Sequence, residues 1–141
     1  MAYNWLAPRV DIFARLLREA LWAPLAILCL SVVLGPVLAA QDLWWLVHVA
    51  GGAALGFCYL RASRIALRNV RPAAAYVVAF TATCSTALGW EMLEFTSDQV
   101  FGTALQEGLL DTMSDLMLGV AGAAGYLAWH ALIASAGRGG R

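Results

Sequence analysis

The sequence predicts an all-α integral membrane protein with four transmembrane helices and an N-terminal amphipathic interfacial helix. Three observations support this fold class. The 141-residue chain is 62% hydrophobic and 13% charged, whereas a soluble domain carries about 25% charged residues. Its apolar residues fall into four runs close to the roughly 20 residues that a membrane helix needs. Its nine basic residues, all arginines, lie outside these runs. The net charge is zero and gives no reason to expect nucleic-acid binding.

The N-terminal segment, residues 1–19, is expected to lie on the membrane surface as a helix over residues 3–19. At about 100° per residue its apolar and charged side chains fall on opposite faces. Pro8 suits the first turn, and Trp5 is a suitable interfacial anchor. The helix is either a simple anchor or a docking surface for a partner. The apolar face holds Trp5, Val10, Ile12, Phe13, Leu16 and Leu17, and the polar face holds Asp11, Arg15, Arg18 and Glu19.

The membrane bundle is expected to occupy residues 20–135. A polar turn at 41–42 and an arginine-rich loop at 61–71 separate the first three runs. Residues 95–108 are too short and polar to cross, and they suggest an interfacial or re-entrant segment. Residues 136–141 are expected to be a disordered tail. The predicted spans are 20–40, 43–60, 72–94 and 109–135.

The arginines predict the orientation of the bundle. All nine lie in the N-terminal segment, in the 61–71 loop or in the tail. The positive-inside rule therefore places both termini and this loop in the cytoplasm of a bacterium, with the chain in the inner membrane. The turn at 41–42 and the segment at 95–108 then face the periplasm.

This layout predicts a polar cluster near the outer face. His48, Glu91 and Asp115 lie at similar depth, roughly 6–10 Å below the outer interface. Intramembrane acids are expensive and are functional by default, so these three are the candidate catalytic residues and the candidate metal ligands. Further acids lie closer to water: Glu94, Asp98 and Asp111.

Three uses of this cluster remain open. Carboxylate oxygens with one imidazole suit a divalent metal such as Zn, Mn or Fe. Crowded carboxylates also suit a proton-handling or general acid/base site. A pocket for a cationic or hydroxyl-rich lipid head group is the third. The alternative to all three is structural, with the acids serving as helix caps and as a polar network between spans. The sequence has no H-E-x-x-H and no C-x-x-C motif.

Small residues predict close helix packing in the second and fourth spans. Such surfaces let helix backbones approach one another in a membrane. They suggest association with another membrane protein or with a second copy of the chain. The glycines concerned are Gly52, Gly56, Gly119, Gly122 and Gly125.

Several short motifs resemble those of the YjdF-like family of bacterial inner-membrane proteins, and more loosely those of the VanZ-like family, which is linked to teicoplanin resistance. The resemblance covers roughly residues 41–125, and it implies a small helical bundle with an acid-rich outer face. It carries no catalytic role over to this chain. The motifs are Trp90-Glu91-x-x-Glu94, Phe101-Gly102-Thr103-x-Leu105-Gln106, Asp111-Thr112-x-x-Asp115-Leu116 and Gly119-x-x-Gly122-Ala123, together with His48 after the acidic turn at Asp42.

Two functions follow as hypotheses. The first is an accessory or binding subunit that joins a larger membrane complex through its Gly/Ala-rich helix faces. The second is an envelope-face enzyme that acts on a lipid or lipid-linked head group through His48, Glu91 and Asp115. A proton- or cation-conducting oligomer is disfavoured, because no acid lies in the inner half of the bilayer.

Overall fold

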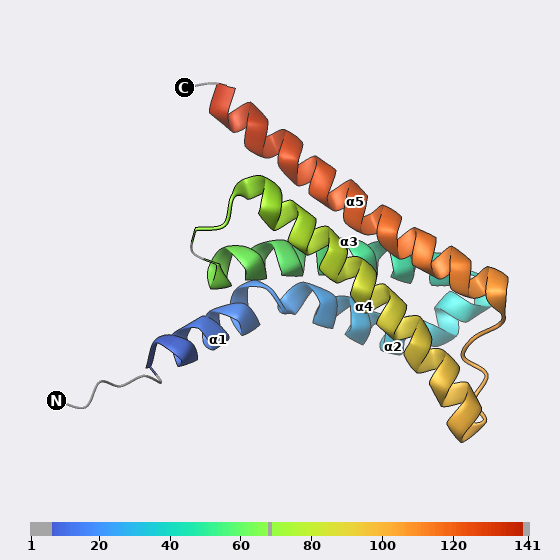
Figure 1. Cartoon of the computed structure of the whole chain (residues 1–141). Helices are drawn as coiled ribbons and strands as arrows, with labels where there is room; N and C mark the ends of the chain where they lie inside the picture. Colours follow the sequence, from blue (N-terminus) through green and yellow to red (C-terminus); the bar gives the residue numbers. More distant parts are fainter. Residues whose placement is uncertain (1–6, 68, 140–141) are drawn as a thin grey trace.

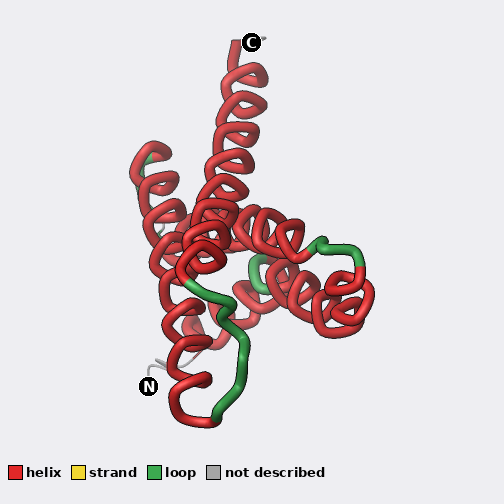
Figure 2. The backbone as a smooth tube through the Cα atoms, turned by 90° about the vertical axis from the view of Figure 1, so that its right-hand side faces the viewer, coloured by secondary structure: helices red, strands yellow, loops and turns green. Residues whose placement is uncertain are grey.

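The computed structural model describes residues 7–67 and 69–139, and within this part the chain is helical with no strand. Of the five helices in this part, the first leads into the second without reversing direction, and the last four run back and forth as successive hairpins (Figure 1). Green segments in Figure 2 mark the connections between helices. The helices are α1 (Ala7–Glu19), α2 (Trp22–Ala40), α3 (Trp44–Ala66), α4 (Pro72–Phe101) and α5 (Leu109–Gly139).

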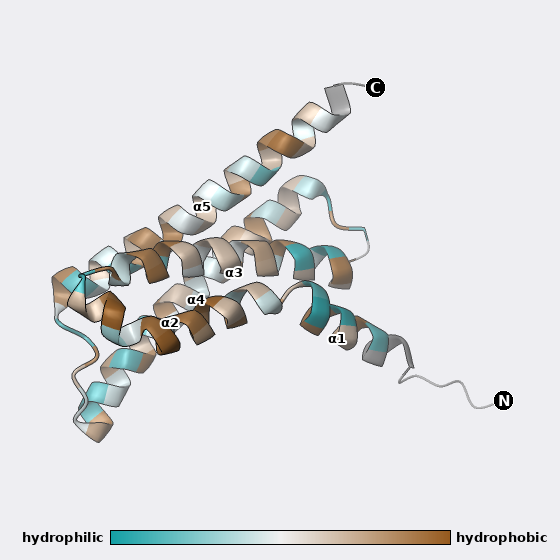
Figure 3. Ribbon diagram, turned by 180° about the vertical axis from the view of Figure 1, so that it is seen from behind, coloured by the Kyte–Doolittle hydropathy of each residue, from teal (hydrophilic) through white to brown (hydrophobic). Residues whose placement is uncertain are grey.

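The two ends of the bundle differ in chemistry. The α2–α3 turn and the α4–α5 loop lie together at one end in Figure 1, which we call the acidic end. The α3–α4 connection and α1 lie at the opposite end, which we call the arginine end. In Figure 3, hydrophobic residues extend along most of α2, whereas hydrophilic residues gather in α1 and near the α4–α5 loop.

Three helices are long and apolar enough to cross a membrane: α2, α4 and residues 109–137 of α5. The second predicted span, α3, is not among them. This helix packs against each of the other four, so much of its surface meets protein. A helix in that position needs less apolar surface than one that faces lipid. On the outside of α2, by contrast, Val32 and Val33 are 74% and 73% exposed, as expected of side chains in contact with lipid.

The structure corrects the predicted segment at 95–108. Helix α4 continues seven residues past Glu94 and ends at Phe101, because the sequence offers no helix-stopping residue before Gly102. Gly102 adopts the left-handed conformation (φ 65°), and its N–H donates to the carbonyl oxygen of Asp98, which is a common way for a helix to end. Residues 102–108 then form a loop without regular structure.

The ends of the chain also differ from the expectation. Helix α5 extends to Gly139, so residues 136–139 are helical and not part of a disordered tail. Ala136 is a strong helix former, and one glycine costs about 1 kcal/mol without ending a helix by itself. Helix α1 is described from Ala7, and the predicted residues 3–6, with Trp5, lie outside the described residues, as do Arg68, 140 and 141.

Helix α3 packs on α5 through glycine. A Cβ atom built on Gly52 would overlap the carbonyl oxygen of Gly119, and one built on Gly122 would overlap the carbonyl oxygen of Val49. A Cβ atom built on Gly56 would lie 3.5 Å from Cα of Ala123, an ordinary contact distance. These small-residue faces therefore meet each other within one chain.

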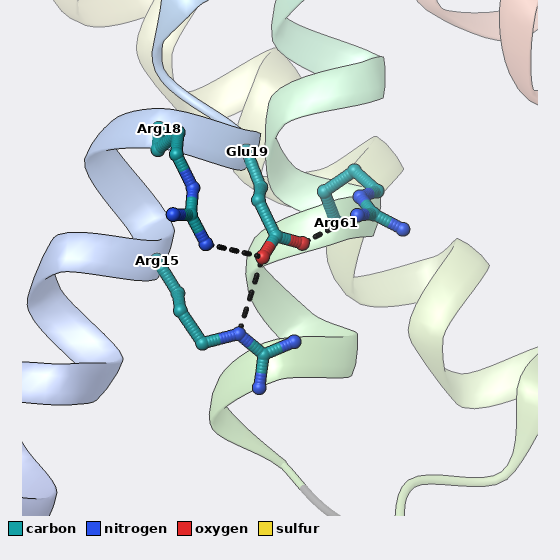
Figure 4. Close-up of polar contacts among 4 residues, drawn as sticks. All are labelled: Arg15, Arg18, Glu19 and Arg61. Carbon is teal, nitrogen blue, oxygen red and sulfur yellow. Dashed lines mark hydrogen bonds and ion pairs between the residues drawn. The ribbon is translucent and has the colours of Figure 1, made fainter.

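An arginine cluster joins α1 to α3 at the arginine end. Arg61 of α3 donates to Oε2 of Glu19 at 2.6 Å, and Arg15 of α1 donates to Oε1 at 3.2 Å. Arg18 lies 3.7 Å from the same carboxylate, so three guanidinium groups surround Glu19 (Figure 4). The hydrogen bond from Arg15 and the surrounding positive charge hold the pKa of Glu19 below its usual range.

Candidate functional site

The candidate site forms where the inward faces of α3, α4 and α5 approach the acidic end. The buried side of α4 repeats at four-residue steps, through Ala75, Ala79 and Thr83 to Glu91 two turns later. Glu91 is therefore buried because it continues this inward stripe. His48 lies one turn before Gly52 on α3, and Asp115 lies one turn before Gly119 on α5.

The glycine contact brings together the first pair of candidate site residues. Because α3 and α5 approach closely at Gly52 and Gly119, residues one turn away remain close as well. Nε2 of His48 lies 3.3 Å from Oδ1 of Asp115. Both side chains are largely shielded, with 19% and 14% exposed.

Glu91 completes a group of three. One nitrogen of His48 and one carboxylate oxygen each of Glu91 and Asp115 lie within 4.8 Å of one another. Glu91 is 5% exposed, and its Oε2 has no hydrogen-bond partner. A buried carboxylate without a partner is costly, so it demands either a proton or a neighbouring cation.

A cavity of about 320 Å³ opens beside these residues, a volume within the range of small-molecule sites. Glu94 lies on the same wall, with one carboxylate oxygen accepting a hydrogen bond from Nε1 of Trp90 at 2.8 Å. The remainder of the lining is mainly apolar and comes from α2, α3 and α4: Pro24, Ile27, Leu28, Ser31, Trp44, Val47, Gly51, Leu55, Thr83, Thr86 and Ala87.

Asp98 and Asp111 lie outside the cavity lining and stabilise local structure. The carboxylate of Asp98 accepts hydrogen bonds from the backbone N–H groups of Leu105 and Gln106 and from the hydroxyl of Thr103, at 2.6–3.0 Å. It therefore holds the 102–108 loop against the end of α4. Asp111, in the first turn of α5, accepts from the backbone N–H of Glu107 at 3.2 Å, and its charge favours the helix N-terminus.

The second histidine belongs to the arginine end. Nε2 of His130 lies 3.4 Å from Arg64, and Nδ1 lies 2.7 Å from the hydroxyl oxygen of Tyr76. A guanidinium only donates, so Nε2 accepts and Nδ1–H donates to Tyr76. Both ring nitrogens of His130 are thus occupied by contacts between α3, α4 and α5, and this network serves packing.

The three-residue group suits a divalent metal ion. A neutral imidazole and two carboxylates are a common donor set for Zn, Mn and Fe, and three protein ligands leave a coordination position for water or substrate. The glycine contact holds His48 and Asp115 close together, and the unpartnered oxygen of Glu91 is the third candidate ligand. The cavity provides access to the open position.

The apolar part of the cavity is not predictable from the sequence. The hydropathy of Pro24, Ile27 and Leu28 predicts only that they belong to a membrane span, yet they line the cavity. No local signal marks them, because α2 is apolar on all sides. The four-residue spacing of Ala75, Ala79, Thr83 and Glu91 is the one pattern that indicates which face of α4 points inward.

A comparison of the chain with known proteins gives a family. No curated protein and no solved structure matches it. The model of a family described as predicted membrane protein (DUF2238) matches residues 12–136, and this is the YjdF-like family. The looser resemblance to VanZ-like proteins has no support in these matches. Because the match covers most of the described bundle, the chain belongs to the DUF2238 family of predicted membrane proteins.

Proposed function

We propose that the protein is a four-span bacterial inner-membrane protein that binds a divalent metal ion at its envelope face. His48, Glu91 and Asp115 are the ligands. The observation behind this proposal is the buried, unpartnered Oε2 of Glu91, within 4.8 Å of potential ligand atoms on the other two residues. A cation there would balance two carboxylates that water reaches poorly.

The proposal includes α3 as the fourth span. Its 23 residues extend roughly 35 Å at 1.5 Å per residue, enough for a hydrocarbon core of about 30 Å. Its central position explains its lower mean hydropathy. With four spans, the arginine end and both termini lie in the cytoplasm, in agreement with the positive-inside rule. The acidic end then faces the periplasm, and α1 lies along the inner interface with Phe13 and Leu17, 62% and 45% exposed, toward lipid.

The metal site supports an enzyme that acts on a lipid or lipid-linked head group. A metal with an open position polarises a phosphoryl or carbonyl oxygen, or lowers the pKa of bound water. The cavity admits a group from the membrane side because its lining is largely apolar. Glu94, half-buried on the cavity wall, is positioned to accept a proton near the metal ligands.

The experiment that tests this proposal is a zinc-binding titration of the purified, metal-depleted protein in detergent. We expect about one Zn²⁺ per chain for the wild type, and at least a tenfold weaker affinity for Glu91→Gln and Asp115→Asn. Glu107→Gln is the matched control, since Glu107 is an exposed acid at the same end. Equal binding by wild type, control and ligand variants would exclude the site.

The accessory or binding role is the second candidate, and one observation favours it. Small residues at helical spacing remain exposed on the outer side of α5, apart from the face that meets α3: Ala121, Ala124, Gly125 and Ala128. A Cβ atom on Gly125 would meet nothing within 4 Å. This stripe, and not the internal contact at Gly52 and Gly122, is where another helix would pack.

The oligomeric state tests the accessory role. If the stripe is an interface, Gly125→Leu will disrupt an oligomer or complex detected by native mass spectrometry. Gly89→Leu is the control, because a Cβ atom on Gly89 also meets nothing within 4 Å and Gly89 belongs to α4. A wild-type protein that is monomeric and carries no partner contradicts this role.

A further inference from the structure

The cavity is a groove between α2 and α4. Both helices pack on α3, but in the described part of the chain no Cα atom of α2 comes within 8 Å of a Cα atom of α4. Helix α3 forms the floor, where Gly51 and Gly52 contribute no side chain. One wall includes Ile27 and Leu28 of α2, and the other includes Thr83 and Trp90 of α4. The groove is therefore bounded by helices that are exposed to lipid.

The lining of the groove is apolar in one part and polar in another. The residues from α2 are mainly apolar, with Pro24, Ile27 and Leu28 beside one hydroxyl, Ser31. The polar part consists of His48 on the floor with Glu91 and Asp115 from α4 and α5. An occupant must combine a hydrocarbon segment with a polar group that reaches the three ligands. Membrane lipids have this division, and the bilayer supplies them at high local concentration.

The charge at the acidic end selects among lipid head groups. Glu94 lies on the groove wall, and Asp111 and Glu107 lie at the same end of the bundle. The described arginines lie in α1, in the last part of α3, at Arg71 and near the C-terminal end of α5, all outside the acidic end. Beyond the metal site, these acids have no counter-charge for a second anionic group, whereas an ammonium ion next to the phosphate would be attracted to them.

We infer that the groove binds an aminophospholipid, with one acyl chain between α2 and α4, its phosphodiester at the metal site and its ammonium ion toward Glu94. The phosphodiester contact rests on the proposed metal function, since the site otherwise presents two carboxylates to a negative group. The acyl-chain contact rests on the groove itself. An aminophospholipid is then either the substrate of the site or a lipid that the site binds without reaction.

Gly51 offers a direct test of the groove. Gly51 lines it, and a Cβ atom at this position meets nothing within 4 Å, so Gly51→Leu fills the groove without displacing its walls. Gly89→Leu adds the same side chain to α4 where there is equal space outside the groove lining. Leu28→Trp blocks the groove from the α2 wall and serves as a second variant.

The experiment uses the full chain in nanodiscs with equal amounts of phosphatidylethanolamine and phosphatidylglycerol. After extraction into mild detergent, native mass spectrometry counts the lipids that remain bound, and elemental analysis measures metal in the same samples. We expect wild type and Gly89→Leu to retain about one phosphatidylethanolamine per chain. Gly51→Leu and Leu28→Trp should retain at least fivefold less of this lipid, while their metal content stays that of the wild type. Glu94→Gln should lose the preference for phosphatidylethanolamine over phosphatidylglycerol.

The outcomes separate this inference from the metal proposal. Suppose that metal is bound at the expected ratio. If no lipid is retained, or if Gly51→Leu retains as much lipid as wild type, lipid binding in the groove is contradicted and the metal site is unaffected. Equal retention of both lipids by wild type overturns the role of the ammonium ion. Retention of phosphatidylethanolamine by a chain that binds no metal overturns the phosphodiester contact, and with it the proposed function.

Discussion

His48 and Asp115 face each other at 3.3 Å, one helical turn from the position where Gly52 and Gly119 bring two helices into contact. On each helix the polar residue precedes the glycine by four residues: His48 precedes Gly52 on α3, and Asp115 precedes Gly119 on α5. The distance between the two functional side chains therefore depends on two residues that have no side chain. Glu91 reaches the pair from a third helix, and this connects packing in the bundle to chemistry at its acidic end.

The glycine contact should be intolerant of even one methyl group. Gly52→Ala places a Cβ atom against the carbonyl oxygen of Gly119, so α3 and α5 must separate. We expect a loss of about 1–3 kcal/mol in the free energy of unfolding, measured by denaturant titration in detergent, together with weaker metal binding. Gly89→Ala, with open space at its Cβ, is the control and should not destabilise the protein. Equal stability of Gly52→Ala and wild type would contradict the packing described here.

Metal should stabilise the wild type and not the Glu91 variant. A ligand at 100 times its dissociation constant adds about 2.7 kcal/mol to the free energy of unfolding. We expect Zn²⁺ to raise the midpoint of thermal unfolding of the wild type and to leave Glu91→Gln unchanged.

Without metal, the wild type should lose its advantage in stability over Glu91→Gln. Metal-depleted Glu91→Gln should be at least as stable as metal-depleted wild type, because a neutral amide replaces a buried carboxylate whose Oε2 lacks a partner. A large loss of stability in Glu91→Gln without metal would show that Glu91 has a structural role instead.

The hydrogen bond from Arg15 to Glu19, with Arg61 and Arg18 beside the same carboxylate, should make stability depend on pH. The pKa of Glu19 is lowered in the folded protein, so its contribution is fully present above its unfolded pKa of about 4.3. That contribution is lost as the pH falls through the lower folded value. The difference in thermal midpoint between wild type and Glu19→Gln should therefore be constant from pH 8 to about 5 and should shrink on further acidification.

Asp11 provides the comparison for this pH dependence. It is an exposed acid on the same helix, and Asp11→Asn should follow the wild-type pH profile. If the difference in thermal midpoint between wild type and Glu19→Gln grows as the pH falls below about 5, the lowered pKa of Glu19 in the folded protein is contradicted.

Asp98 should control the 102–108 loop without affecting the metal site. Its carboxylate accepts three hydrogen bonds from that loop, and removal of the carboxylate takes away all three acceptor contacts together. We expect Asp98→Ala to speed proteolytic cleavage within the loop at least tenfold, while Zn²⁺ affinity remains that of the wild type. Asp42→Asn, in the other turn of the acidic end, is the control. Unchanged cleavage would mean that other contacts hold the loop.

Much of the architecture can be predicted from the sequence, because membrane helices follow length and hydropathy. The common depth of His48, Glu91 and Asp115 follows from the order of the hydrophobic runs. Their mutual contact does not, because depth leaves the rotation of each helix about its axis undetermined. That rotation depends on which glycines contact each other. In a sequence rich in glycine and alanine, several small residues on other helices could contact Gly52, and the sequence does not determine which one does.

Two further features were beyond local sequence patterns. The polar residues after Glu94 predict an interfacial or re-entrant segment, but α4 continues to Phe101, because a helix can extend into polar sequence beyond its apolar part. The central position of α3 is a property of the whole bundle. It explains why a run containing Trp44, Trp45 and His48 can lie among more apolar helices, and why the internal glycines are unavailable to partners.

The most direct test of the central claim is the metal content of the protein purified from native membranes without chelators. Elemental analysis of wild type and Glu91→Gln, both monodisperse and folded, compares a complete site with one that lacks a single charged ligand. The account predicts about one divalent transition metal per chain in the wild type and a loss of most of it in Glu91→Gln. A wild type without metal, which also fails to take up Zn²⁺, Mn²⁺ or Fe²⁺ when these are added, would contradict it.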